Sequence, residues 1–134
     1  MQNERDWAIA VVRIATGIVF LAHGSQKVFE YGMAGVSASF GQMGIPVPSI
    51  FGPLVALLEL VGGIALLLGL LSRWVAALLA LEMAVAILKV HLKGGFFLPA
   101  GIEFALTMFS TSLAVALAGP GAAAIDHLLF KGGS

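Results

Sequence analysis

The chain has 134 residues, of which 60% are hydrophobic and 10% are charged, with seven lysines and arginines against seven aspartates and glutamates. This composition excludes a disordered chain and most soluble folds, and the zero net charge offers no basic patch for nucleic acid. The absence of cysteine excludes disulfides, thiolate metal sites and iron–sulfur clusters. The sequence therefore predicts an integral membrane protein, since a helical span needs about 20 apolar residues and several such stretches are present.

Four apolar segments are expected to cross the membrane. The first covers residues 6–30 and is a retained helix rather than a signal peptide, because Arg13 interrupts its apolar core and no small-x-small cleavage site follows. The second covers residues 50–71 and ends at a short polar turn. The third covers residues 73–92 and ends at paired glycines, and the fourth covers residues 96–118 and ends at a Gly-Pro-Gly sequence.

These segments predict an all-α fold, an up-down-up-down four-helix membrane bundle that forms a single domain over residues 1–134. Residues 31–49 are too many for a simple turn, so we expect a loop or half-helix there. Residues 122–130 predict a short amphipathic tail along the membrane surface. The distribution of positive charge slightly favours cytoplasmic termini. The side of the termini would carry Arg5, Arg13, Arg73 and Lys131, and the other side Lys27, Lys89 and Lys93.

Charged side chains inside these spans are the strongest functional signal. Each costs at least about 2.5–3.5 kcal/mol at the centre of a membrane helix and normally faces the protein interior with a partner. The rise per residue places Glu59 and Glu82 near the midplane, where they would be neighbours. With no basic residue on its own helix, Glu59 must be neutral or paired with Arg13 or Lys89. Glu82 either pairs with Lys89 or shares a proton with Glu59.

A second set of polar side chains lies in the half of the bundle beneath residues 31–49. On the fourth span, Thr107 and Ser110 continue the face of Glu103, so we expect this polar stripe to point into the bundle. The set at this depth consists of His23, Lys89, His91 and Glu103.

Such residues could hold a quinone, whose two carbonyl oxygens need hydrogen-bond or proton donors in an apolar cleft. No metal is required, and two histidines at similar depth are too few to predict a haem site. The predicted site comprises Glu59 and Glu82 as a catalytic proton relay, His23, Lys27, His91 and Glu103 as ligand-binding residues, and Arg13 and Arg73 as structural or partner-docking charges.

The alternative is a scaffold whose buried charges hold the helices together, or a small transporter or ion path. Four helices are few for alternating access, so transport would require a homo-oligomer or a partner. No nucleophile with a positioned base is evident, so independent hydrolase or transferase activity is not expected. Membrane lipids are partners under every hypothesis.

Several short patterns occur along most of the chain. They are Arg13, His23-Gly24-x-x-Lys27, Gly44-Ile45-Pro46-Val47-Pro48, Glu59-Leu60-x-Gly62-Gly63, Leu68-Gly69-Leu70-x-x-Arg73, Glu82-Met83 and Asp126. In this order they resemble the DoxX family of small bacterial membrane proteins. The resemblance implies a four-helix protein of the bacterial cytoplasmic (inner) membrane, similar to the membrane subunit of thiosulfate:quinone oxidoreductase. It also implies an association with detoxification or thiol-stress enzymes and a redox partner protein. Thiol chemistry does not carry over, because the chain has no cysteine.

Overall fold

The computed structural model describes residues 2–130, and the regular structure in this range is entirely helical. Lys131, one of the charges used to predict orientation, lies outside the described residues. In chain order the elements are α1 (Gln2–Ser25), the π-helical turn η1 (Gln26–Tyr31), α2 (Gly32–Gln42), α3 (Pro48–Leu68), α4 (Ser72–Ala86), the π-helical turn η2 (Ile87–His91), the 3₁₀ turn η3 (Leu92–Gly94), α5 (Glu103–Ala118) and α6 (Asp126–Leu129).

Three helical stretches are long and apolar enough to cross a membrane, namely Gln2–Gln42, Pro48–Leu68 and Ser72–Gly94. The fourth apolar helix, α5, has 16 residues. At about 1.5 Å per residue it is shorter than the roughly 30 Å of a hydrocarbon layer. The sequence predicts that this span starts at residue 96, but α5 begins at Glu103. The residues before it form a turn, which is closed by a hydrogen bond from the Ile102 N–H to the Gly95 carbonyl at 3.0 Å.

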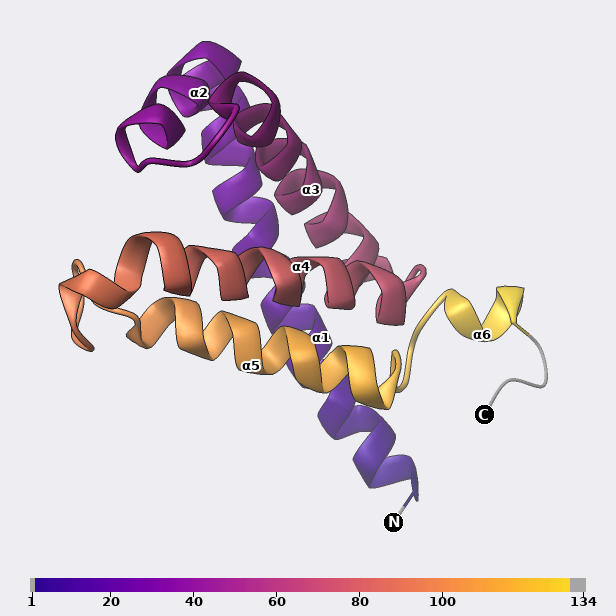
Figure 1. Ribbon diagram of the computed structural model, residues 1–134. Helices are drawn as coiled ribbons and strands as arrows, with labels where there is room; N and C mark the ends of the chain where they lie inside the picture. Colours follow the sequence, from indigo (N-terminus) through magenta and orange to yellow (C-terminus); the bar gives the residue numbers. More distant parts are fainter. Residues whose placement is uncertain (1, 131–134) are drawn as a thin grey trace.

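The helices form two packed pairs that cross each other (Figure 1). Helix α1 packs along α3, and α4 packs along α5. Helix α2 folds over the far end of α3, so the predicted half-helix in residues 31–49 is present. Helices α3 and α4 meet at a tight turn, in which Gly69 and Leu71 have φ values of 69° and 49°. From this turn the two helices diverge, and the space between them contains the candidate site.

Two glycines allow α1 and α3 to approach closely. A Cβ atom at Gly24 would overlap the backbone of α3 at Leu60 and Glu59, and one at Gly63 would overlap the backbone of α1 at Leu21. Apolar side chains gain little by leaving lipid for another helix, so close backbone packing of this kind is a main source of helix association in membranes. The contact also places Glu59 against the end of α1.

Arg13 connects the segment that follows α5 to the other helices through hydrogen bonds. The side chain is fully buried, with 0% exposure. Its Nε donates a hydrogen bond to the Leu66 carbonyl at 2.9 Å, and its two terminal nitrogens donate to the carbonyls of Pro120, Ala122 and Ala123. The guanidinium is therefore occupied by backbone carbonyls and is not the partner of a midspan glutamate.

Asp126 anchors the same segment from its other end. Its carboxylate accepts hydrogen bonds from the N–H groups of Leu71 at 2.6 Å and Ser72 at 2.9 Å, which caps the start of α4. The sequence predicts a tail lying along the membrane surface. Instead, the part that leads to Asp126 is bound between the ends of α1, α3 and α4, while Leu128 and Leu129 are exposed.

Arg73 has a comparable role at the surface. Its guanidinium donates to the last carbonyls of α5, with the shortest bond to Leu117 at 2.8 Å. A cation at this position also interacts favourably with the helix dipole. Both arginines thus donate hydrogen bonds to backbone carbonyls.

Candidate functional site

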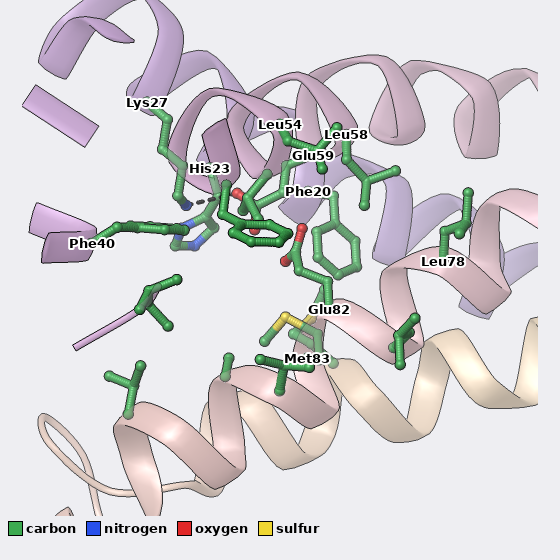
Figure 2. A pocket seen from close by; sticks show the side chains of 18 of the residues that line it. Phe20, His23, Lys27, Phe40, Leu54, Leu58, Glu59, Leu78, Glu82 and Met83 are labelled. Atoms are coloured by element: carbon green, nitrogen blue, oxygen red, sulfur yellow. Dashed lines mark hydrogen bonds and ion pairs between the residues drawn. The ribbon is translucent and has the colours of Figure 1, made fainter. Parts of the chain in front are cut away.

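A cavity of about 530 Å³ lies between α3 and α4 and is also lined by residues of α1, α5, and α2 with the segment that follows it. This volume falls in the range of about 300–1,000 Å³ typical of small-molecule sites. Most of the wall is apolar, and Figure 2 shows aromatic and aliphatic side chains such as Phe20, Leu58 and Met83 around the space. The polar and charged residues of the lining are His23, Lys27, Glu59, Glu82 and His91.

Lys27 and Glu59 form an ion pair at the inner end of this cavity. The Lys27 Nζ lies 2.6 Å from the Glu59 Oε1, and the two side chains are 20% and 7% exposed. The sequence predicts that Glu59 is either neutral or paired with Arg13 or Lys89, and both predicted partners are wrong. Arg13 is bound to backbone carbonyls elsewhere, and Lys89 is exposed on η2. Lys27 reaches Glu59 because η1 extends α1 past the close contact with α3.

Glu82 faces this ion pair from α4. Figure 2 shows its carboxyl group pointing toward that of Glu59, so the prediction that these residues are neighbours is confirmed. Its Oε1 is buried and has no hydrogen-bond partner among residues 2–130. An unsatisfied buried polar atom costs about 1–3 kcal/mol. Glu82 therefore has an unused capacity for hydrogen bonding at the polar end of an apolar cavity.

The two histidines line the cavity from opposite helix pairs. His23 is on α1 and packs against Phe104 of α5, with ring centroids 5.3 Å apart and an interplanar angle of 36°. His91 is in η2, at the end of α4. Five of the six predicted ligand-binding and relay residues thus line the same cavity, namely His23, Lys27, Glu59, Glu82 and His91.

Glu103 does not line the cavity. Its carboxylate accepts a hydrogen bond from the Leu98 N–H at 2.7 Å and so closes the turn before α5. Thr107 and Ser110 are exposed, and their hydroxyls donate to carbonyls of their own helix at 2.9 and 2.8 Å. The expectation that this stripe points inward is wrong, because other residues form the buried face of α5. These are Ala105, Met108, Ser112 and Val115.

The cluster can position and protonate a polar head group. The Lys27 ammonium can donate to a carbonyl or hydroxyl oxygen, and Glu59 and Glu82 can exchange a proton with each other or with a bound molecule. The surrounding apolar wall strengthens these interactions because it excludes water.

Comparison with known proteins agrees with this architecture. The sequence model of the DoxX family matches residues 8–92, a range that includes every polar residue of the cavity. The chain is 38% identical over 132 residues to the Bacillus subtilis protein named "Putative oxidoreductase CatD", covering 98% of this chain and 94% of that protein. It is 36% identical over 135 residues to the inner membrane protein YqjF of Escherichia coli, covering 98% of both chains.

A third relative is a mycobacterial protein. The membrane protein Rv3486 of Mycobacterium tuberculosis is 32% identical over 142 residues, which cover 98% of this chain and 86% of that protein. No solved structure gave a significant match. The apolar helices and these relatives together identify a bacterial membrane protein. The chain therefore belongs to the DoxX family.

Proposed function

We propose that this chain is the integral membrane subunit of a quinone-linked or detoxification-related oxidoreductase system in the bacterial inner membrane. Its cavity would hold a quinone or lipid head group. The observation that carries the proposal is the cluster of Lys27, Glu59 and Glu82 in a cavity whose wall is mostly apolar. The chain would form an up-down four-helix bundle with cytoplasmic termini.

The chemistry of a quinone matches this cluster. Reduction of a quinone to a quinol takes up two electrons and two protons, and each carbonyl oxygen becomes a hydroxyl group. Lys27 would donate a hydrogen bond to one oxygen, and Glu59 and Glu82 would transfer protons. His23 and His91 line the same space and would orient the head group. The electrons would come from a redox partner protein, because none of these side chains carries electrons.

The test measures the ratio of quinol to quinone in the membranes of cells from which the gene is deleted. These cells carry either no copy of the gene or a plasmid copy of one of three forms of the protein. Wild type, Glu59→Gln and Glu30→Gln are compared at equal amounts of membrane-inserted protein. Glu30 is a matched control, since it is an exposed glutamate on η1 that does not line the cavity. We expect Glu59→Gln to behave like the deletion and Glu30→Gln like wild type. A wild-type ratio in Glu59→Gln, or in the deletion itself, would refute the proposal.

A second candidate is a non-enzymatic scaffold or small transporter that works as an oligomer or with a partner. It is favoured by the finding that Arg13 and Asp126 are buried and that, among residues 2–130, their hydrogen-bond partners are backbone groups. If Lys27 and Glu59 also have only a structural role, the double variant Lys27→Met/Glu59→Leu should fold and should show the same quinol-to-quinone ratio as wild type. The redox hypothesis predicts a folded chain that no longer supports quinone turnover.

A further inference from the structure

The outer rim of the cavity is apolar and belongs to the lipid-facing sides of α3 and α4. Leu54, Leu78 and Leu81 line the cavity and are 55%, 53% and 62% exposed. They lie well inside the apolar stretches Pro48–Leu68 and Ser72–Gly94. The opening is therefore at the depth of the hydrocarbon layer, and a molecule that enters there must already be dissolved in the membrane.

The inner end of the cavity disfavours a charged head group. The ammonium of Lys27 is already paired with Glu59 at 2.6 Å, and the carboxyl group of Glu82 faces the same pair. A phosphate would meet two carboxyl groups and one cation that is no longer free, and an ion that leaves water without a full partner pays a large desolvation cost. An uncharged head avoids this cost, and its hydroxyl or carbonyl oxygens can hydrogen-bond to Glu82 and Lys27.

The shape of the cavity gives the ligand a direction. The side chains of Lys27 and Glu59 are 20% and 7% exposed, whereas the apolar rim residues between α3 and α4 are more than half exposed. A molecule with a polar head and an apolar tail matches both ends only when the head is innermost. A tail longer than the cavity then passes between the rim leucines into the surrounding lipid.

We infer that the cavity binds a long-tailed amphiphile with an uncharged polar head, which enters sideways from the bilayer between α3 and α4. Its head lies against Lys27, Glu59 and Glu82, and its tail lies between the rim residues. This inference names the ligand class of the site in the proposed function and rests on that proposal for the identity of the site. It excludes phospholipids and other amphiphiles with an anionic head.

The first experiment compares three probes that share a ten-carbon tail. Decylubiquinone, 1-decanol and decyl phosphate are added to the full-length protein in mild detergent, and the number of molecules bound per chain is measured by native mass spectrometry. We expect one decylubiquinone or one decanol per chain, and at least about tenfold weaker binding of decyl phosphate because its charge is left without a free partner.

The second experiment tests the entrance. The protein is placed in phosphatidylcholine nanodiscs, and the rate at which decylubiquinone occupancy appears after mixing is measured for Leu81→Trp and Leu117→Trp. Leu117 is the matched control, since it is 72% exposed on α5 and lies outside the cavity lining. A bulky ring at the rim should slow association at least about fivefold, and the control should leave it unchanged. Leu78→Trp provides a second rim variant if Leu81→Trp does not fold.

The outcomes separate this inference from the proposed function. Binding of decanol without decylubiquinone would support the uncharged-amphiphile site and reject the quinone. Equal binding of decyl phosphate, or no binding of any probe, would overturn the inference, and the quinol ratio would still test the redox role. Wild-type association rates in both folded rim variants would overturn the sideways entrance.

Discussion

Replacement of Arg13 by methionine should detach the segment between α5 and α6 from the bundle. The side chain has 0% exposure, and the carbonyls of Leu66, Pro120, Ala122 and Ala123 accept its hydrogen bonds. Methionine retains much of the apolar volume but donates no hydrogen bond. All four carbonyls would then lose a charged donor within a buried site.

The expected loss follows from these contacts. A hydrogen bond to a charged group contributes about 1.5–3 kcal/mol, and the four bonds are not additive because some carbonyls can turn toward water once the segment is released. We therefore expect the free energy of unfolding to fall by about 3–5 kcal/mol, which is less than the sum of four such bonds.

Arg73→Met is the matched control, because Arg73 also donates to carbonyls but at the exposed end of α5. A cation at the C-terminus of a helix contributes about 0.3–1 kcal/mol to the free energy of unfolding. Both variants are unfolded by titration with sodium dodecyl sulfate in mixed micelles, and protease cleavage within residues 122–130 is followed in parallel. The reasoning would be refuted if Arg13→Met lost no more stability than Arg73→Met, or if its C-terminal segment stayed protected.

Three further predictions test other contacts. Asp126→Asn should lower the free energy of unfolding by about 1 kcal/mol in the same titration, because the carboxylate caps the first N–H groups of α4, and an unchanged value would contradict this role. Gly63→Ala should reduce the yield of monodisperse protein in gel filtration, whereas Gly35→Ala, whose added Cβ meets only an ordinary contact at 3.6 Å, should not. Lys27→Met should destabilise the fold, and Lys27→Met/Glu59→Gln should recover part of the loss, since the second change removes the carboxylate left unpaired. A double-mutant cycle with no coupling energy would argue against the ion pair.

The sequence predicts the apolar helices and the proximity of Glu59 and Glu82, because both follow from the lengths of the apolar runs and the rise per residue. Long apolar runs identify the spans, and a constant rise per residue is enough to bring Glu59 beside Glu82. The partner of Glu59 could not be derived in this way. It depends on a π-helical turn that extends α1 and on a glycine contact that decides which helices pack together, and neither follows from helical periodicity.

The failures on α5 and in the tail have different causes. Thr107 and Ser110 share a face with Glu103, but their hydroxyls are satisfied by the preceding turn of their own helix, so nothing forces this face inward. Asp126 caps a helix that begins 54 residues earlier in the chain. No local motif reports a cap supplied from such a distance.

The most direct test of the proposed site is to identify the small molecules that remain bound to the protein when it is purified from its own membranes. The chain is purified in mild detergent, and native mass spectrometry determines the mass and number of bound small molecules for wild type, Glu59→Gln, His23→Ala and Glu30→Gln. We predict one uncharged, long-tailed quinone per chain, lost from Glu59→Gln and His23→Ala and retained in Glu30→Gln. A wild-type protein with no such molecule, or cavity variants that retain it fully, would contradict a ligand site at the Lys27–Glu59–Glu82 cluster.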